Sequence, residues 1–412
     1  MTFPQAITAG VPSLRRVAVV ALVLMTAACG GGGGNGGGPT PPSSTPIRVT
    51  FPGVGALGIF DPAVTQDTTG RMWMSYSAVD SSANSIWGVG IRLGYTDDAG
   101  TVWNDAGSIH AFRDVIVLPG ISVTSPEPAI TQNSPGIWQS ETSTVVYDPH
   151  ASVPVGERWK MLWFQALVIN NSAYFASYSW IALKTANTAA GLAAAPATKL
   201  FGGYLIKNDA TSLTNTGAPI AGAPAIALNL INNNPELASC VFGEPSLLAT
   251  SDALYLALDC NSLGNPLLPY IVMFRCASPC TMTNIASWSY LGRVTTPADA
   301  TAINSSYKSL GAPALTTQGG RYYLITTPVV TSGDRYDGCR VYEFSNLATG
   351  TLARDLSGNL LPPVAQVTGL SGTHHGACAY HAALPNGILH SQLETTNPPQ
   401  IFRIYQSRVG IP

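Results

Sequence analysis

A pattern that recurs five times decides the fold, and its clearest copy is LGAPALTTQGGRYYLITT at residues 310–327. Each copy holds an apolar strand, a polar turn and a second strand rich in aromatic residues, which is typical of a β-hairpin. The other copies are FDPAVTQDTTGRMWMSYS at 60–77, ETSTVVYDPHASVPVGERWKMLWF at 141–164, FGEPSLLATSDALYLAL at 242–258 and the degenerate HGACAYHAALPNGILHSQL at 375–393. The repeat therefore predicts five β-hairpins.

Further apolar segments follow each hairpin, for example WGVGIRLGYTDD at 87–98 and IFRIYQS at 401–407. Four antiparallel strands are the content of one propeller blade. We therefore expect an all-β fold in which residues 47–412 form a five-bladed β-propeller of four-stranded antiparallel blades. TDDAGTVW, from Thr96 to Trp103, fits the Asp-box pattern of propeller blades, and we expect it to be a structural turn.

Composition narrows the class of partner. The chain has 412 residues, of which 46% are hydrophobic and only 10% charged, with 20 Lys and Arg against 22 Asp and Glu. Such a chain has a sizeable core, and the absence of a basic stripe argues against a nucleic-acid partner. No apolar run beyond residue 30 is long enough for a membrane-spanning helix.

The first 46 residues predict export and a lipid anchor. Two arginines precede the apolar stretch 17–24, and MTAAC follows it, as in a signal peptide that ends at a lipidated cysteine. We expect residues 1–28 to be a lipoprotein signal peptide, Cys29 the lipidated residue, and 29–46 a Gly- and Pro-rich tether. Gly30 is compatible with sorting to the outer membrane or cell surface. An ordinary signal peptide is the alternative.

Six further cysteines are compatible with three disulfides in an exported protein. Cys240 and Cys260 are equidistant from a turn at Thr250-Ser251, so a hairpin places them opposite each other. Cys276 and Cys280 close a short loop, which leaves Cys339 to pair with Cys378. A zinc site made of these cysteines is the alternative, although the usual C-x-x-C spacing is missing.

Carboxylates open three of the repeats. Asp61, Glu141 and Glu244 begin the first three, whereas the fourth has Ala312 and the fifth the stretch 374–377. In a propeller these positions lie near the central axis, where a ligand has access. The alternative is that the acids satisfy backbone amides in turns.

At these residues the chain resembles five-bladed propeller glycoside hydrolases of the arabinanase, levansucrase and invertase type, most closely family 43. Asp61-Pro62-Ala63-Val64 and Glu244-Pro245 carry the resemblance. It implies that Asp61 is the general base, Glu244 the general acid, and a second-blade acid the residue that adjusts the pKa of Glu244. Glu141 is that acid by position, but Thr142 stands where the family has Pro, and Glu127 in SPEPAI is a rival. The resemblance also implies inversion.

Other residue types suggest how a sugar is held. Trp138 lies three residues before Glu141, while Phe60 and Trp87 flank the first repeat, so we expect these aromatic rings to bind substrate. We expect His374 and His375 to bind substrate too, and the resemblance allows a Ca or Na ion near the axis that His375 contacts. No cofactor is required by this chemistry. Four tryptophans within strand patterns are expected in the core: Trp73, Trp159, Trp163 and Trp180.

The predicted function is therefore hydrolysis of glycosidic bonds in a poly- or oligosaccharide by paired carboxyl groups. The rival is a propeller without catalysis that binds glycan or a surface protein. A sialidase lacks support because GIFDPAV contains no arginine. A serine hydrolase lacks its G-x-S-x-G motif.

Overall fold

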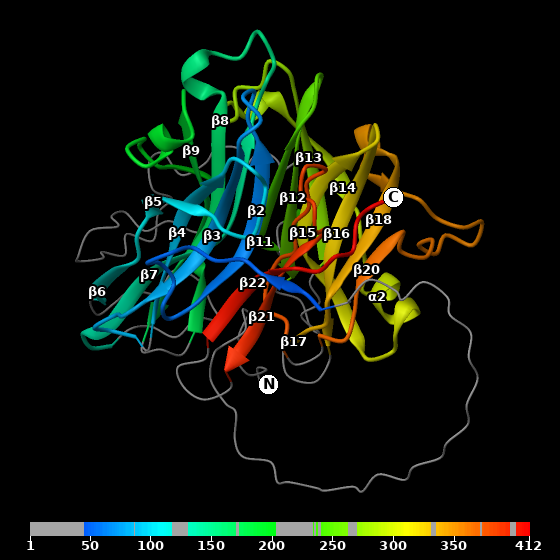
Figure 1. The fold of residues 1–412 in the computed structure, drawn as a ribbon. Helices are drawn as coiled ribbons and strands as arrows, with labels where there is room; N and C mark the ends of the chain where they lie inside the picture. The colour runs from blue at the N-terminus through cyan, green and yellow to red at the C-terminus, as the bar shows by residue number, and fades with distance from the viewer. Residues whose placement is uncertain are drawn as a thin grey trace, which may run out of the picture.

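The computed structural model describes residues 45–85, 87–117, 131–169, 173–202, 234, 236–237, 240–262, 270–330, 335–370, 373–395 and 401–412. These residues form five antiparallel sheets (Figure 1). The predicted all-β class is confirmed. Within the described ranges, no helix is both long and apolar enough to cross a membrane. The predicted signal peptide, Cys29 and nearly all of the tether lie outside the described residues.

Each of the first three sheets is formed by strands that are consecutive in the sequence. Sheet 1 contains β2 (Ile59–Gln66), β3 (Met72–Asp80), β4 (Gly88–Thr96) and β5 (Asn104–His110). Sheet 2 contains β6 (Arg113–Val117), β7 (Ser134–Tyr147), β8 (Trp159–Ile169), β9 (Ala173–Ala186) and β10 (Thr198–Gly202). Sheet 3 contains β11 (Cys240–Ala249), β12 (Ala253–Ser262), β13 (Tyr270–Ala277) and β14 (Trp288–Arg293).

The last two sheets depart from this pattern. Sheet 4 contains β15 (Tyr307–Gln318), β16 (Arg321–Val330), β17 (Arg335–Tyr336), β18 (Cys339–Asn346), β19 (Thr351–Leu352) and β20 (Ala365–Val367). Sheet 5 contains β21 (Leu389–Thr395), β22 (Ile401–Gln406) and β1 (Ile47–Arg48). The prediction of four strands in every sheet is wrong, because sheets 2, 4 and 5 have five, six and three strands.

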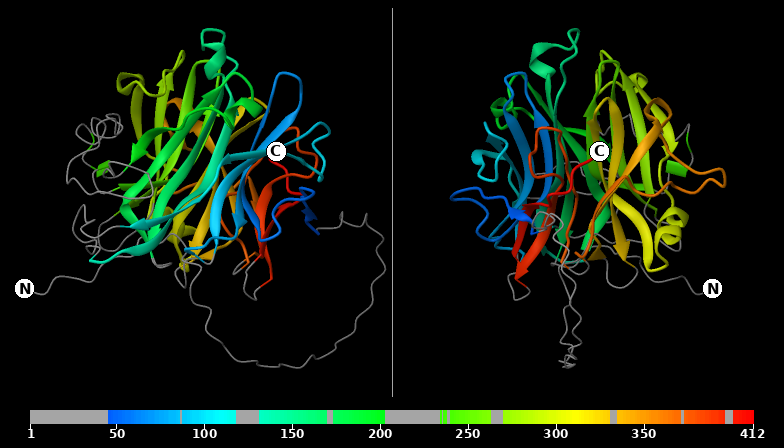
Figure 2. Two further views of the ribbon diagram at one scale, coloured as in Figure 1. Left: turned by 90° about the vertical axis from the view of Figure 1, so that its left-hand side faces the viewer. Right: turned by 45° about the vertical axis from the view of Figure 1, so that its right-hand side comes forward.

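Sheet 5 joins the two ends of the described chain. Ile47 pairs with Gln406 and Arg48 with Tyr405, so the first strand completes the sheet formed by the last two. In Figures 1 and 2 this puts the beginning and the end of the coloured ribbon side by side. The degenerate fifth repeat explains the low strand count, because its first half pairs with β21 only through the isolated bridges Ala379–Leu389 and His374–Gln392.

The core consists of apolar interfaces between neighbouring sheets. Four of the five largest described clusters take residues from the strands of two sheets: 1 and 2, 2 and 3, 3 and 4, and 5 and 1. The remaining cluster joins sheet 4 to residues just outside the strands of sheet 5, namely Cys378, Tyr380, Ile388 and Ile411. The interfaces thus return to the sheet from which they began. Such burial of apolar side chains is the main driving force for folding. The four tryptophans predicted for the core are buried: Trp73, Trp159, Trp163 and Trp180.

The described helices are short and lie between strands. The longest, α2 (Pro297–Ile303), begins with a capping box in which Thr296 and Asp299 satisfy each other's backbone amides. The single-turn helices are η1 (Val155–Glu157), η2 (Ala190–Leu192), η4 (Ile285–Ser287) and η5 (Leu347–Thr349).

The predicted Asp-box is a turn after β4. Asp98 Oδ1 accepts hydrogen bonds from Thr96 Oγ1 at 2.7 Å and from the Gly100 amide at 2.9 Å. The buried Trp103 donates its Nε1–H to the Gly100 carbonyl at 3.0 Å. The motif therefore has the structural role that the sequence predicts.

The three predicted disulfides are confirmed. The structure pairs Cys240 with Cys260, Cys276 with Cys280, and Cys339 with Cys378. The first links the adjacent strands β11 and β12, as the hairpin symmetry implied.

Candidate functional site

One backbone position recurs in four sheets, on strands β2, β7, β11 and β15. Asp61, Thr142, Glu244 and Ala312 have φ values of 51°, 47°, 48° and 47°, in the left-handed region that non-glycine residues rarely adopt. Each residue lies where the strand register shifts at a β-bulge. We call these four residues the bulge positions. Strained backbone of this kind is concentrated at functional sites.

The bulge position of sheet 2 is Thr142, one residue beyond the predicted Glu141. Glu141 precedes the register shift and pairs with Phe164, and its side chain is half-buried. Thr142 Oγ1 donates a hydrogen bond to Asp61 Oδ2 at 3.0 Å. The prediction that Glu141 is equivalent to Asp61 is therefore wrong, because a one-residue shift along a strand turns the side chain to the opposite face. Glu127 lies outside the described residues.

Hydrogen bonds tie three bulge positions to strands β21, β3 and β12 of other sheets. The Asp61 amide donates to Ser391 Oγ at 3.1 Å, and the Thr142 amide donates to Ser77 Oγ at 3.0 Å. In the same way the Ala312 amide donates to Asp259 Oδ2 at 3.2 Å. This repeated contact fixes the positive-φ residues of different sheets relative to one another.

Asp61 is 2% exposed and both of its carboxyl oxygens accept hydrogen bonds. Oδ1 accepts from the Ala377 amide at 2.9 Å, while Oδ2 accepts from Ser77 Oγ at 3.2 Å and from Thr142 Oγ1. A Cβ atom on Gly376 would lie 1.6 Å from Oδ1, so the close approach of the carboxyl group requires glycine there. The carboxyl of sheet 1 is thus held against the chain that precedes β21.

Burial and the charge of Glu244 raise the pKa of Asp61 to about 7, against the lowering effect of its three hydrogen bonds. Taking a carboxylate out of water penalises its charged form, and a second negative charge adds to the penalty. Near neutral pH the Asp61 carboxyl is therefore distributed between its protonated and ionised forms.

Glu244 is half-buried as a residue, but its Oε2 is buried and has no hydrogen-bond partner among the described residues. Its Oε1 accepts a hydrogen bond from the Tyr336 hydroxyl at 3.1 Å. Asp259, on β12, is buried, and burial together with the neighbouring Glu244 carboxylate raises the pKa of Asp259 well above its usual range. Burial raises the pKa of Tyr336 well above its usual range, and the charges of Glu244, Asp259 and Asp61 raise it further.

Two residues of this site, Asp259 and Tyr336, are absent from the sequence prediction. Asp259 lies in the apolar strand segment LALDC, where one buried acid among aliphatic residues is an unusual feature. That signal was available in the sequence. Tyr336 lies on the two-residue strand β17 and gave no comparable signal.

The predicted substrate-binding aromatic residues are buried. Trp138 is 1% exposed and packs 4.8 Å from Trp180, so the prediction that its ring faces a sugar is wrong. Its position on β7 directs the indole into the interface with sheet 1. Phe60 and Trp87 are also buried, in a small apolar cluster with Phe402. Their buried rings offer no open face to a ligand.

The two histidines occupy different surroundings. The His375 ring stacks on Phe402 at 4.5 Å and meets Phe60 edge-on at 4.9 Å, and burial lowers the pKa of His375 to about 4. His374 is buried, and its Nε2 lies 3.6 Å from Cys378 Sγ, which argues against the predicted contact with substrate.

Among the described residues, His375 belongs to no group of three His, Cys, Asp or Glu side chains that could hold a metal ion. Within the described ranges, the potential ligands that come together in a group of three are Cys339, His374 and Cys378, where both sulfurs belong to a disulfide. The predicted Ca or Na ion near the axis remains a prediction.

Comparisons with known proteins give structural similarity alone. No family model and no curated protein matches the sequence. An arabinanase from Bacillus subtilis is 14% identical, with 86% of this chain and 94% of that chain covered and a TM-score of 0.43. An α-L-arabinofuranosidase from Fusarium graminearum is 9% identical, with coverages of 87% and 96% and a TM-score of 0.44. A thermostable family-43 glycoside hydrolase is 15% identical, with coverages of 87% and 91% and a TM-score of 0.44.

Proposed function

We propose that the five sheets are the blades of a five-bladed β-propeller. The closed succession of apolar interfaces supports this arrangement. The strands that carry the bulge positions contact one another in the order β2, β7, β11 and β15. Strand β2 also contacts β21. In a propeller such inner strands surround the axis, which brings the bulge positions of different blades to one central site.

We further propose that this site hydrolyses glycosidic bonds in a poly- or oligosaccharide. The observation that carries the proposal is that Glu244 lies within electrostatic reach of two carboxyl groups whose pKa values are raised, Asp61 and Asp259. Glycosidic cleavage requires one protonated carboxyl at the leaving oxygen and one ionised carboxylate for water or the sugar. A carboxyl group such as Asp61, whose pKa is raised to about 7, supplies the protonated form near neutral pH.

The electrostatics favour an exchange of the roles implied by the family resemblance. Asp61, with its pKa raised to about 7, is the better proton donor, which leaves Glu244 as the base. Asp259 takes the place proposed for Glu141 as the third acid beside Glu244. Inversion of the anomeric centre remains a prediction that product analysis tests.

The burial of Asp61 favours one alternative. Its side chain is almost fully buried and accepts three hydrogen bonds, as a purely structural carboxyl would. In that case the protein is a non-catalytic propeller that binds glycan or a surface protein, and Glu244 contributes to binding alone.

Reducing-sugar release from arabinan, xylan, fructan and galactan tests the proposal. The purified protein is compared with Glu244→Gln, Asp61→Asn and the control Glu343→Gln, which changes an acid outside the site. We expect release from at least one glycan that both site variants abolish and the control retains. Glycan binding without hydrolysis across the panel would establish the non-catalytic alternative.

For location, we propose an exported protein held at the cell envelope by a lipid on Cys29, at the outer membrane or cell surface. The signal-like residues 1–28 and the Gly-rich segment after Cys29 support this proposal. The lipid bilayer and a carbohydrate substrate are then its partners. Metabolic labelling with a fatty acid, compared between the full chain and Cys29→Ala, tests the anchor.

A further inference from the structure

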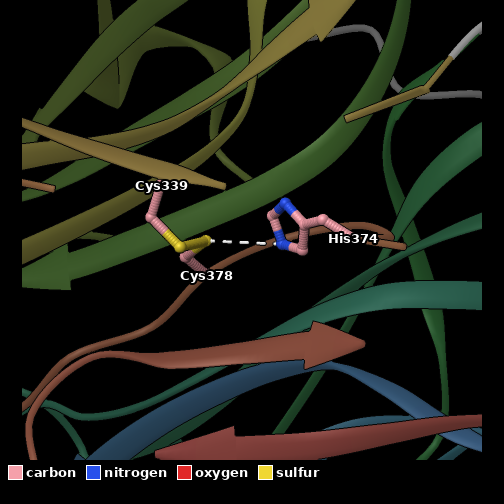
Figure 3. Close-up of side chains that lie close together, drawn as sticks. All are labelled: Cys339, His374 and Cys378. Carbon is pink, nitrogen blue, oxygen red and sulfur yellow. Dashed lines mark hydrogen bonds between the residues drawn. A yellow bond between two sulfur atoms is a disulfide. The ribbon is translucent and has the colours of Figure 1, made fainter. Parts of the chain in front are cut away.

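One of the three disulfides differs from the others in its surroundings. Cys339 begins β18 in sheet 4, whereas Cys378 lies in the segment before β21, so this bond links two sheets. His374 lies four residues before Cys378, and Figure 3 shows its ring facing the disulfide. Its Nε2 is 3.6 Å from Cys378 Sγ, and all three residues are buried.

The other two disulfides lack such a neighbour in the described part of the chain. Cys240–Cys260 joins adjacent strands of sheet 3, and Cys276–Cys280 closes a short loop after β13. The group of three metal-ligating side chains that the described residues form is the one around Cys339 and Cys378. The disulfides Cys240–Cys260 and Cys276–Cys280 can therefore be compared with Cys339–Cys378, the bond beside His374.

Once reduced, Cys339 and Cys378 would offer, together with His374, the set of ligands that zinc prefers. Two thiolates and one neutral imidazole form a Cys2His site, in which a water molecule completes the tetrahedron. The ligand atoms of Cys339, His374 and Cys378 all lie within 4.8 Å of one another. With the usual bond lengths, a sulfur and a nitrogen on tetrahedral zinc are about 3.6 Å apart. His374 Nε2 already has this separation from Cys378 Sγ.

The Cα atoms of Cys339 and Cys378 are 6.2 Å apart. Two thiolates on one tetrahedral zinc ion are about 3.8 Å apart. The side chains must therefore move the two sulfurs away from each other once the bond between them is broken.

We propose that Cys339, Cys378 and His374 form a redox-gated zinc site, closed while the disulfide is intact and opened by its reduction. A dithiol or a phosphine supplies two electrons, the S–S bond breaks, and each sulfur takes up one proton. The dithiol becomes a disulfide, or the phosphine an oxide with oxygen from water. Zinc then displaces the two thiol protons and binds the two sulfurs and His374 Nε2. This proposal is independent of glycoside hydrolysis.

Metal analysis of the full chain tests the proposal. Protein treated anaerobically with a phosphine is mixed with Zn2+, freed of excess metal by gel filtration and analysed for bound zinc, beside untreated protein. The reduced protein should bind about one more zinc ion per chain than reduced His374→Asn, while the oxidised protein binds none at this site. The control His150→Asn, in a turn remote in sequence, should match the reduced wild type.

Two further variants keep the result decisive. Cys240→Ser/Cys260→Ser removes a different disulfide and should retain the His374-dependent zinc, whereas Cys339→Ser/Cys378→Ser should lose it. His374→Asn keeps all cysteines and forms its disulfides before reduction, so folding of the double variants does not decide the outcome. Co2+ in place of Zn2+ should give the visible bands of a tetrahedral thiolate site. Equal zinc uptake by reduced wild type and reduced His374→Asn would overturn the proposal.

Discussion

Asp61 and Glu244 occupy the same backbone position in sheets 1 and 3, yet their carboxyl groups meet different surroundings. Both residues have φ near 50° and both precede a proline. Asp61 is almost fully buried under three hydrogen bonds, whereas Glu244 is half-buried and accepts one from Tyr336. A repeated backbone position thus holds the Asp61 carboxyl by three hydrogen bonds and the Glu244 carboxyl by one, and in the proposed function this difference separates the proton donor from the base.

The largest expected effect is that of removing the Glu244 carboxylate. Glu244→Gln should reduce kcat by about 10²–10⁴-fold, the usual contribution of one acid–base group. The free energy of unfolding should change little, because the amide still accepts the Tyr336 hydroxyl. Initial rates on the best glycan of the panel measure the first effect, and urea unfolding the second. An unchanged kcat would remove Glu244 from the chemistry.

The position of the Asp61 carboxyl depends on a glycine. Gly376→Ala places a Cβ 1.6 Å from Asp61 Oδ1 at a residue with φ of +72°. We expect a loss of about 3 kcal/mol in the free energy of unfolding, from backbone strain and from the weakened Ala377 contact. Gly410→Ala is the control, since its Cβ meets no atom within 4 Å and its φ is not positive. Equal stability of the two variants would contradict the described packing.

The pH dependence of stability reports on the ionisation of Asp61. Asp61 titrates near 7 in the folded chain and near 3.8 when unfolded, so the folded state holds the extra proton between these values. The stabilisation is fully present below about pH 4 and is lost as the pH rises to about 7, by at most about 1.4 kcal/mol per pH unit. Asp61→Asn should remove the contribution of Asp61 to this slope in urea unfolding. Asp259 acts in the same direction, so the test is the difference between wild type and variant.

The smallest expected effect concerns the hydroxyl of Thr142. Thr142→Val removes the hydrogen bond to Asp61 Oδ2, at a cost of about 1 kcal/mol in the free energy of unfolding above neutral pH. Because that bond favours the ionised form, its loss should raise the pKa of Asp61 further. A double-mutant cycle with Asp61→Asn measures the coupling. Additive effects of the two substitutions would show that the contact contributes nothing.

The sequence predicts the sheets and disulfides better than the site. Alternating apolar strands around polar turns, and cysteines placed symmetrically about such a turn, are local signals, and β11 and β12 show both. The bulge of sheet 2 lies at Thr142, one residue beyond the conspicuous Glu141. No local signal in the sequence shows that the bulge falls on Thr142 and not on Glu141.

Trp138 and Asp259 illustrate what the sequence leaves undetermined. The side of β7 on which the Trp138 indole packs depends on the neighbouring sheet 1. Asp259 lies on a second strand, and it reaches the site only because the Glu244 bulge of the paired strand lies beside it. Both outcomes arise from contacts between strands that are distant in sequence.

A carbon-13 NMR titration of the Asp61 carboxyl measures the property on which the proposed chemistry depends. The expected midpoint is about 7 in the wild type. It should be lower in Glu244→Gln, because the charge of Glu244 contributes to the raised pKa. A midpoint near 3.8 in both proteins would contradict the account, since Asp61 would then hold no proton to donate at neutral pH.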